Sequence, residues 1–572
     1  MGDLSATGRR LALARLAETP LDVLVIGGGI TGAGVALDAA ARGYSVGLVE
    51  RGDFASGTSS QSTKLVHGGI RYLPQLDIPL VREALVERGR LLRNAPHLVH
   101  PLTFILPLYA SSRHPVGLPI APPFGMGLDL ILDTGLALYD ELAGKQNLGK
   151  HRRIDRDEVL ARARCLTPAG LKTGFIYHDA QTDDTRLTLA VLRTGAEHGA
   201  LLANYCAVTG FAHDDGRVAG VHARETLPGD EGPAAGTGFV VRARHIVNAT
   251  GVWAEQTERL DGETPTLQVA PSKGAHLVFT REALDLGDEA IVLPETEDGR
   301  IIFIVPWQSR ALVGTTDNGV EQMETPIATE DDIDYLLGHL NRSVRRPLTR
   351  ADIVATYAGY RPLLRLHRRR TPARLSRTHA VTEGEDGLLT VSGGKLTTYR
   401  LMAQDVVDRI DRREDHTRRH VTLRLPLSGA PASLGTEETH TETAGEEPPL
   451  DVAVLAHLSG AYGSHACAVR ALVRERPQLA ARLVPDLPYI GAEVVYVCRT
   501  EMALTLEDVL ARRTHIAIED RSRGLDAAPA VAVLMAEELG WSHAEYERQL
   551  AAYRAYAQEQ AGPLPLPSAA VP

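Results

Sequence analysis

The sequence is poor in the residues that build disulfide frameworks and zinc sites. Its 572 residues include only four cysteines, Cys165, Cys206, Cys467 and Cys498. No two of them have the CxxC spacing typical of metal or redox motifs. We therefore predict neither a disulfide framework nor a metal site, and this cysteine usage favours a reducing compartment such as the cytoplasm. Residues 1–20 contain arginines but no continuous apolar stretch, so no secretory signal is expected.

An excess of positive charge is also missing. Lys and Arg number 61 against 72 Asp and Glu, which gives a net charge of -11. Because general affinity for nucleic acid needs a cationic face, no nucleic-acid partner is predicted. A pocket for an anionic substrate must then supply its own cations. For the basic run at 365–370 a solvated loop is the favoured interpretation, with contact to anionic lipid head groups as the alternative.

The apolar stretch that stands out most in the sequence is not expected to cross a bilayer. The longest apolar stretch, 116–139, contains three prolines and two aspartates, which a spanning helix tolerates poorly. From Phe124 onward the apolar side chains predict a helix whose apolar face either packs in the core or dips into a membrane interface, and both remain open. That face consists of Met126, Leu128, Leu130, Ile131, Leu132, Leu136 and Leu138.

The N-terminal region reads as strand, turn, helix and strand. Residues 22–26 are apolar and β-branched, 33–42 are rich in alanine, and 44–49 form a second strand-like run. Alternation of strand, helix and strand predicts a βαβ unit of an α/β fold.

A glycine-rich turn joins the first predicted strand to the helix. It has the pattern GxGxxG, and Glu50 ends the next strand 21 residues after Gly29. In this context the pattern predicts dinucleotide binding: glycines allow a tight turn, close backbone approach to a pyrophosphate and close helix packing, while the carboxylate binds ribose hydroxyls. The turn consists of Gly27, Gly28, Gly29, Ile30, Thr31 and Gly32.

The stretch after Glu50 favours FAD over NAD. Residues 54–64 are small and polar and run directly into Leu65, whereas an NAD enzyme usually continues the alternation of helix and strand. We expect this stretch to lie along the pyrophosphate and ribityl chain of a flavin, with a helix cap as the alternative for one or two residues. The expected contacts are Thr58, Ser59, Ser62, Thr63 and Lys64.

The rest of the chain indicates a resumed α/β unit, a cap and a helical domain. A helix is expected over 185–198 and strands over 201–208, 218–223 and 239–249; short β-rich runs at 267–280 and 300–316 predict an antiparallel sheet. We expect a discontinuous dinucleotide domain (20–92, 170–258 and 352–412), a substrate-binding cap (93–169 and 259–351), an acidic linker (428–449) and a helical C-terminal domain (450–560).

Several segments resemble the FAD-dependent glycerol-3-phosphate dehydrogenases. The resemblance rests on GTSSQSTKLVHGGIRYL at 57–73, DDTRL at 183–187, NATG at 248–251, SKGAH at 272–276, IVPW at 304–307, GTTD at 314–317, GYRPL at 359–363 and SGGKLTTY at 392–399. It implies a glutathione-reductase-like FAD domain with an inserted antiparallel cap and an appended helical domain.

The same resemblance implies a function. Members of this family oxidise sn-glycerol 3-phosphate to dihydroxyacetone phosphate by hydride transfer from C2 to flavin N5, and pass the electrons to a membrane quinone. They sit on the inner face of the cytoplasmic membrane without spanning it. Closely similar oxidases use oxygen instead and release peroxide. The oligomeric state stays open, with a homodimer as one alternative.

Alcohol oxidation needs a base, and the family motifs offer two histidines. His67 is the first candidate and His276 the second, with a structural role as the alternative for each. A phosphate dianion suits the planar fork of arginine, so Arg361 and Arg71 are the expected clamps, beside Tyr360 and Tyr72.

The remaining expected contacts lie along the cofactor. Lys395, with Gly394, Leu396 and Thr397, is expected to open a helix facing the flavin pyrimidine ring, where positive charge stabilises reduced flavin. Gly251 is expected near the dinucleotide. Ala207 and Val208, at the end of a strand, are expected at the adenine.

Three rival functions stay open from the sequence. A glycerophosphate oxidase would share the same motifs and differ in its electron acceptor. An amine or amino-acid oxidase of the same fold would bind a carboxylate instead of a phosphate ester. A flavin-binding regulatory protein without turnover is the third, and the intact set of polar residues in the family motifs disfavours it.

Overall fold

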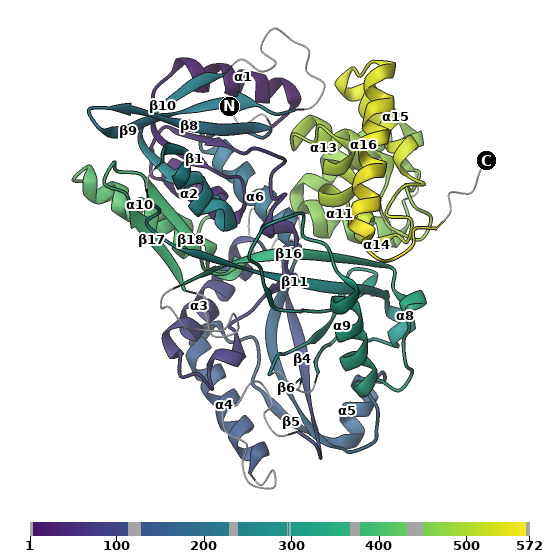
Figure 1. Ribbon diagram of the computed structural model, residues 1–572. Helices are drawn as coiled ribbons and strands as arrows, with labels where there is room; N and C mark the ends of the chain where they lie inside the picture. The colour runs from purple at the N-terminus through teal and green to yellow at the C-terminus, as the bar shows by residue number, and fades with distance from the viewer. Residues whose placement is uncertain are drawn as a thin grey trace.

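The computed structural model describes two β-sheets and a helical domain (Figure 1). The structure describes residues 4–112, 127–227, 238–262, 264–293, 296, 299–365, 378–431 and 450–567. Most of the predicted linker (432–449), the start of the predicted apolar stretch (116–126) and most of the basic run (366–370) lie outside the described residues.

The first sheet has eight strands and a parallel centre. Strands β18, β10, β1, β2 and β7 run parallel, β17 pairs antiparallel at one edge, and β8 and β9 extend β10 as an antiparallel ribbon. The strands are β1 (Leu21–Ile26), β2 (Val46–Val49), β7 (Leu201–Ala203), β8 (Cys206–Asp214), β9 (Arg217–Glu225), β10 (Phe239–Asn248), β17 (His379–Glu383) and β18 (Leu389–Gly393).

Helix α2 (Ile30–Ala41) is the central helix of this sheet. Ten of its twelve residues are buried, which explains its apolar composition on every side. It packs against α6 (Asp184–Glu197) and α10 (Tyr399–Arg413), and their apolar side chains share one core cluster with β1 and β2. The predicted βαβ unit and the predicted helix at 185–198 are thus confirmed.

The second sheet has ten strands and is almost entirely antiparallel. Its order is β15-β11-β14-β13-β12-β4-β6-β3, with β16 beside β11 and β5 beside β6. The strands are β3 (Leu65–Val66), β4 (Val99–Tyr109), β5 (Arg152–Asp155), β6 (Leu171–Thr182), β11 (Val269–Thr280), β12 (Ala290–Val292), β13 (Phe303–Trp307), β14 (Arg310–Gly314), β15 (Asn318–Gly319) and β16 (Ala355–Leu364). The antiparallel sheet predicted at 267–280 and 300–316 is therefore present.

Short and long helices cover this second sheet. They are α3 (Ile78–Asn94), α4 (Leu128–Ala143), α5 (Arg156–Arg162), α8 (Arg281–Leu284) and α9 (Glu330–Ser343). Helix α4 buries Leu132, Leu136 and Tyr139, whereas Leu130, Ile131 and Leu138 are 42–68% exposed. The helix thus combines a core face with an apolar outer face.

The C-terminal domain is helical, as predicted, and lies beside the first sheet (Figure 1). It has its own apolar core. Its helices are α11 (Val452–Tyr462), α12 (Ala466–Glu475), α13 (Gly491–Thr500), a π-helix (Asp508–Arg513), α14 (Ile516–Glu519), α15 (Ala528–Leu539) and α16 (His543–Ala561). By length and composition alone, one helical stretch among the described residues, Val452–Glu475, is apolar enough to cross a membrane.

Three features differ from the sequence-based expectation. The strand expected over 201–208 is two strands, because Tyr205 has a positive φ of 51° between β7 and β8. Strands β6 and β16 pair in the ten-stranded sheet, although the predicted boundaries assign them to the dinucleotide domain; alternation identifies a strand but not its partners. Helix α1 (Ala6–Glu18) was not anticipated.

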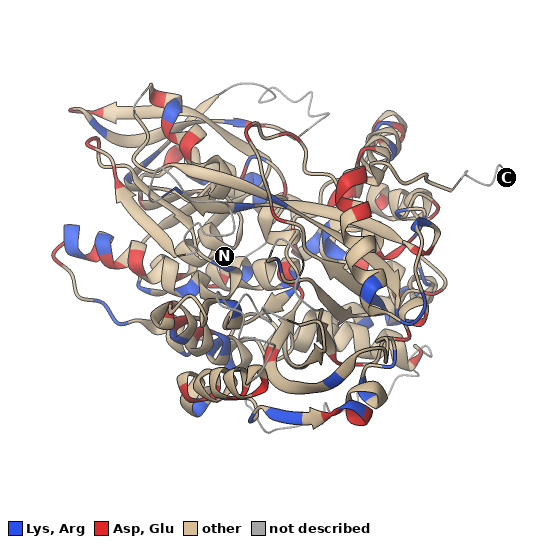
Figure 2. Ribbon diagram, turned by 60° about the horizontal axis from the view of Figure 1, so that its bottom comes forward, with Lys and Arg blue, Asp and Glu red and all other residues tan. Residues whose placement is uncertain are grey.

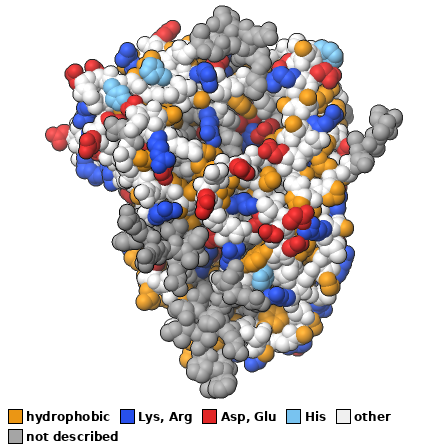
Figure 3. Space-filling view, in the orientation of Figure 1, with side chains coloured by type: hydrophobic (Ala, Val, Ile, Leu, Met, Phe, Trp, Pro, Cys, Tyr) orange, Lys and Arg blue, Asp and Glu red, His pale blue; other side chains and the backbone are white. Residues whose placement is uncertain are grey.

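Charged residues of both signs are spread over the molecule (Figure 2). On the face seen in Figure 3, basic and acidic side chains are interspersed and do not gather into one basic patch.

We expect two glycine-to-alanine substitutions in helices to have opposite effects on stability. A Cβ at Gly32 would lie 1.9 Å from the carbonyl oxygen of Gly27, whereas a Cβ at Gly338 in α9 meets nothing within 4 Å. Gly32→Ala should lower the free energy of unfolding by about 1–3 kcal/mol through overpacking, and Gly338→Ala should raise it by about 0.4–1 kcal/mol. Urea titration followed by circular dichroism measures both; equal stability of the Gly32→Ala protein and wild type would contradict the close packing.

Candidate functional site

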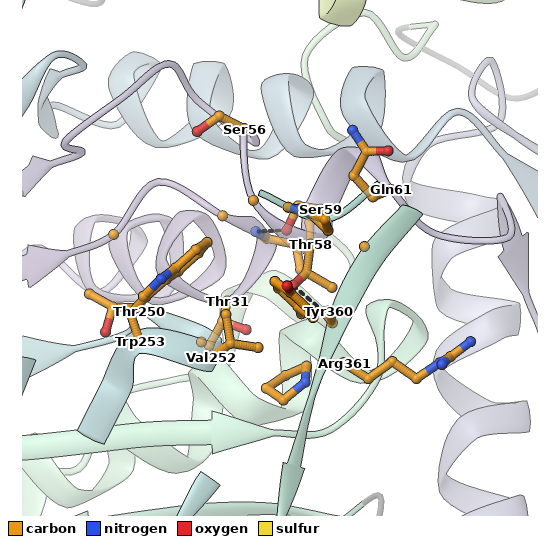
Figure 4. Close-up of a pocket in the computed structure, with 18 of the residues that line it drawn as sticks. Thr31, Ser56, Thr58, Ser59, Gln61, Thr250, Val252, Trp253, Tyr360 and Arg361 are labelled. Atoms are coloured by element: carbon orange, nitrogen blue, oxygen red, sulfur yellow. Dashed lines mark hydrogen bonds between the residues drawn. The ribbon is translucent and has the colours of Figure 1, made fainter. Parts of the chain in front are cut away.

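A cavity of about 930 Å³ extends from the β1–α2 turn to β16. Residues of both sheets line it, and a close-up shows side chains of the β1–α2 turn, the 56–61 segment and β16 facing it (Figure 4). Its volume is at the upper end of the range of about 300–1,000 Å³ that is usual for ligand and cofactor sites. It is the main candidate site among the described residues.

The glycine-rich turn forms a close backbone cradle on one wall of the cavity. Gly27 has φ +109°, and a Cβ there would lie 2.8 Å from the carbonyl oxygen of Ala249. A Cβ at Gly29 would lie 3.1 Å from Ser59 Oγ. Gly29 caps the start of α2, whose N-terminus offers backbone N–H groups and a positive dipole end. This cradle fits the pyrophosphate of a dinucleotide, and Gly28, Ile30, Thr31 and Gly32 are part of the same turn.

Glu50 follows β2 and lines the same cavity. Its carboxylate accepts the backbone N–H of Gly28 at 2.6 Å and that of Gly52 at 2.9 Å. Burial raises the pKa of Glu50, although these two hydrogen bonds act in the opposite direction. The carboxylate is thus oriented beside the glycine turn, where it was expected to bind ribose hydroxyls.

The polar stretch after Glu50 also lines the cavity, with Thr58, Ser59, Ser62 and Thr63 among the lining residues. Ser59 Oγ accepts the backbone N–H of Ile30 at 2.9 Å, and Thr58 Oγ1 donates to the carbonyl oxygen of Tyr360 at 2.6 Å (Figure 4). These bonds tie the stretch to both α2 and β16.

Lys64 is not brought to the cavity, contrary to expectation. Its side chain is fully buried and forms an ion pair with Asp184 at the start of α6. Its Nζ also donates to the carbonyl oxygen of Ser60 at 2.7 Å. A buried ammonium group needs such a partner, and here the partner is a carboxylate behind the polar stretch.

His276, on β11, faces the cavity and is 2% exposed. Its Nε2 lies 2.9 Å from Thr63 Oγ1, and its ring stacks on Tyr357 at 4.5 Å. Burial, followed by the positive charges of Arg361 and Lys64, holds the pKa of His276 well below 6.5. The imidazole is therefore neutral near pH 7.

His67 lines the cavity together with Gly394, Lys395, Leu396 and Thr397. The backbone N–H of His67 donates to Thr397 Oγ1 at 3.2 Å. Lys395 precedes a short 3-10 turn that leads into α10, as expected for a helix start. The structure thus joins the 57–73 and 392–399 motifs at one place.

Arg361, on β16, is half-buried and lines the cavity. One guanidinium nitrogen donates to Thr315 Oγ1 at 2.9 Å and the other lies 3.3 Å from an Asp317 oxygen. Tyr360 lines the cavity beside it. These contacts orient the guanidinium group at the cavity wall.

Arg71 and Tyr72 do not line the cavity within the part of the chain that the structure describes. Arg71 donates to Tyr72 Oη at 2.9 Å and stacks on that ring. The ring of Tyr72 in turn lies 4.4 Å from Lys395 Nζ. The pair therefore contacts the cavity wall through Lys395.

Ala207, Val208 and Gly251 line the cavity as expected for the nucleotide end. Ala207 and Val208 lie at the start of β8 and not at the end of a strand, because of the break at Tyr205. Gly251 follows β10 with φ +61°.

Further lining residues had no local sequence signal. They include Arg51, Trp253 and five residues of the C-terminal domain: Glu507, Arg512, Tyr556, Glu559 and Gln560. The C-terminal residues lie more than 450 positions from the glycine turn, so no spacing pattern could have joined them.

Comparisons with known proteins agree with this geometry. The model of the FAD dependent oxidoreductase family matches residues 22–400, and that of the C-terminal domain of alpha-glycerophosphate oxidase matches residues 420–546. The chain is 39% identical over 555 residues to glycerol-3-phosphate dehydrogenase 2 of Mycobacterium tuberculosis, covering 96% of this chain and 90% of that one. It is 36% identical over 562 residues to a probable mitochondrial glycerol-3-phosphate dehydrogenase of Caenorhabditis elegans, covering 95% and 74%.

A solved structure agrees with the same assignment. The glycerol-3-phosphate dehydrogenase of Bacillus halodurans, complexed with FAD, superimposes with a TM-score of 0.78 at 29% identity and covers 98% of this chain and 99% of that one. FAD is thus the cofactor that the glycine cradle, Glu50 and the polar stretch fit. The chain belongs to the family of FAD-dependent glycerol-3-phosphate dehydrogenases.

Proposed function

We propose that this protein oxidises sn-glycerol 3-phosphate to dihydroxyacetone phosphate with FAD and passes the electrons to a quinone. The observation that carries the proposal is a single cavity that joins a dinucleotide cradle to two histidines, an arginine and a lysine from four separate motifs. Residues of a merely structural cluster need not meet at a cofactor site; catalytic residues must.

His67 is our candidate for the group that takes the alcohol proton. It lines the cavity beside Thr397, and it is less buried than His276. FAD, when bound, supplies the acceptor for the C2 hydride. Loss of the hydroxyl proton to an imidazole nitrogen, together with loss of the hydride from C2, leaves the ketone as product, and the protonated imidazole later returns its proton to solvent.

His276 is better suited to orient the substrate. Its low pKa keeps it neutral, and its Nε2 is already within hydrogen-bond distance of Thr63 Oγ1. A neutral imidazole in this position donates or accepts one hydrogen bond without adding charge.

Arg361 is the proposed anion-binding residue. Its guanidinium group lies at the cavity wall, held by Thr315 and Asp317. In an acidic protein a phosphate dianion needs a local cation, and the fork of arginine matches its oxygens. Lys395 adds a second positive charge, and Arg71 is proposed to act behind it through Tyr72.

A peripheral membrane contact through α4 is proposed for delivery of electrons to quinone. Leu130, Ile131 and Leu138 form an apolar outer face on this helix. The helix lies at the end of the molecule away from the first sheet and the C-terminal domain (Figure 1). An apolar helix face of this kind can enter the interface of a bilayer without crossing it.

Replacement of the proposed base should slow the reductive half-reaction selectively. In His67→Asn we expect the rate of flavin bleaching by glycerol 3-phosphate under anaerobic conditions to fall by about 10²–10⁴, the usual contribution of a general base. Flavin content should stay at the wild-type level. His276→Asn serves as the matched comparison; a larger loss in that variant would make His276 the base.

Arg361→Lys should weaken substrate binding while it leaves FAD in place. Loss of charge-assisted hydrogen bonds worth about 1.5–3 kcal/mol raises KM for glycerol 3-phosphate by about 10- to 100-fold. Arg346→Lys is the control and should leave KM unchanged, because the Arg346 side chain is 67% exposed and pairs with Asp352 at the surface. An unchanged KM in Arg361→Lys would contradict the role of Arg361 in anion binding. Faster bleaching by an amino acid than by glycerol 3-phosphate would favour an amino-acid oxidase.

The electron acceptor and the role of α4 can be tested together with vesicles that contain menaquinone. Wild-type protein should reduce vesicle menaquinone faster than oxygen. Leu130→Glu with Ile131→Glu should lower the vesicle rate at least about tenfold, because each buried leucine or isoleucine contributes about 1.5–3 kcal/mol, while reduction of a soluble dye is unchanged. Val533→Glu on α15 is the control, since Val533 is 48% exposed elsewhere. Release of peroxide in an amount equal to the dihydroxyacetone phosphate formed, with menaquinone reduced no faster than oxygen, would indicate an oxidase.

A further inference from the structure

The C-terminal helical domain forms part of the cofactor cavity. Glu507 and Arg512, at the π-helix, and Tyr556, on α16, line the cavity together with residues of the dinucleotide-binding sheet. None of these residues belongs to a motif of the catalytic body. The domain therefore does more than pack against the outside of the protein.

A buried carboxylate connects this domain to the cofactor-binding segment. Asp53, three residues after Glu50, has a side chain with 0% exposure. Its oxygens accept from Arg512 Nε at 2.6 Å and from Arg513 at 2.5 and 2.9 Å. Although burial raises it, the two guanidinium groups of Arg513 and Arg512 hold the pKa of Asp53 below its ordinary value. Asp53 is thus a carboxylate, and both its cationic partners come from the other domain.

The arginine pair is fixed within its own domain. Arg512 also donates to Glu507 at 2.6 Å and to Asp508 at 2.7 Å. Arg513 donates to the carbonyl oxygen of Glu501 at 2.8 Å. Each guanidinium group therefore has little freedom to move away from Asp53 while the C-terminal domain stays folded.

A second contact strengthens the same junction. Tyr205, between β7 and β8, donates through its hydroxyl to Asp508 at 2.6 Å, and its backbone N–H donates to the carbonyl oxygen of Gly52 at 2.8 Å. Asn204 donates both to Asp53 at 3.2 Å and to the carbonyl oxygen of Met502 at 3.0 Å. The junction therefore extends along the 50–53 segment and does not depend on one ion pair.

The segment that Asp53 belongs to holds the cofactor cradle at both ends. At one end Glu50 bonds to the glycine turn, and at the other Ser59 bonds to the start of α2. Between them, the backbone N–H of Ala55 donates to the carbonyl oxygen of Gly28 at 3.1 Å. Any displacement of Asp53 must move groups that line the dinucleotide site.

We propose that the C-terminal domain retains FAD: Arg512 and Arg513 hold Asp53, and with it the 50–59 segment, against the dinucleotide. Docking of the helical domain and occupancy of the FAD site then stabilise each other. Linkage requires that this effect be reciprocal. The inference rests on the cofactor and not on the substrate or the electron acceptor.

Substitution of arginine by lysine tests the proposal with a matched control. Arg513→Lys removes the two-pronged contact with Asp53 but keeps the charge. Arg310→Lys is the control. Arg310 is a buried arginine on β14, and it also joins the catalytic body to the C-terminal domain by donating to the carbonyl oxygen of Glu519. This contact involves the second sheet and not the 50–59 segment. The rate of FAD release from the holoenzyme is followed by the rise of flavin fluorescence on dilution.

We expect FAD release at least about tenfold faster in Arg513→Lys, within the usual range of coupling between sites, and a rate within about twofold of wild type in Arg310→Lys. Asp53→Asn should show the same direction as Arg513→Lys. Equal release rates in Arg513→Lys and Arg310→Lys would overturn the proposal. Should Asp53→Asn fail to fold, the two lysine variants still decide the question.

Hydrogen exchange supplies a second readout on the unaltered protein. FAD-loaded wild type should exchange the amides of the π-helix (Asp508–Arg513) more slowly than the apoprotein, whereas α11, which does not line the cavity, should change little. Identical exchange of the π-helix with and without FAD would contradict the coupling. Neither measurement involves turnover of glycerol 3-phosphate, so their failure would leave the proposed function untouched.

Discussion

The close approach of backbone to backbone at the β1–α2 turn is the constraint on which the rest of the structure depends. Gly32 lies against the carbonyl oxygen of Gly27, and Gly27 lies against Ala249 at the end of β10. Any side chain at these positions would push α2 off the sheet. Because α2 packs against α6 and α10, its start remains at the cavity, where a pyrophosphate can meet the positive end of the helix.

Two groups of buried ion pairs lie close to the cofactor cavity. Lys64 pairs with Asp184, and Asp53 pairs with Arg512 and Arg513. Replacing such a pair by apolar residues is often neutral, but removing one partner leaves an unpaired buried charge, which is costly. These pairs therefore specify which segments must lie together, and they leave Arg361 and Lys395 to act at the cavity wall.

Much of the fold could be predicted from the sequence, and the reasons are local. The glycine turn, Glu50 and the alanine-rich α2 follow from spacing and composition, and the helical C-terminal domain follows from its 3.6-residue periodicity. Partners could not be predicted in the same way. The assignment of β6 and β16 to the ten-stranded sheet depends on hydrogen bonds with β4 and β11, which alternation does not specify. The break at Tyr205 depends on one positive φ.

For the site, the family motifs identified the residues of the cavity wall to which a role in the reaction is proposed: His67, His276, Arg361 and Lys395. Lys64 turned away from the cavity because Asp184, 120 positions later, attracts it. Arg512 and Arg513 escaped detection for the same reason: their partner Asp53 is more than 450 positions away. Long-range electrostatic pairing has no period and leaves no signature in a single sequence.

The place of the arginine pair after both sheets in the chain has a consequence for biosynthesis. Residues 1–420 emerge from the ribosome before the pair does, and they already contain both sheets and the glycine turn. The wall that Glu507, Arg512 and Tyr556 contribute to the cavity emerges later. Since domains fold as units in order of synthesis, the flavin pocket is finished only once the C-terminal helical domain has been made and has folded.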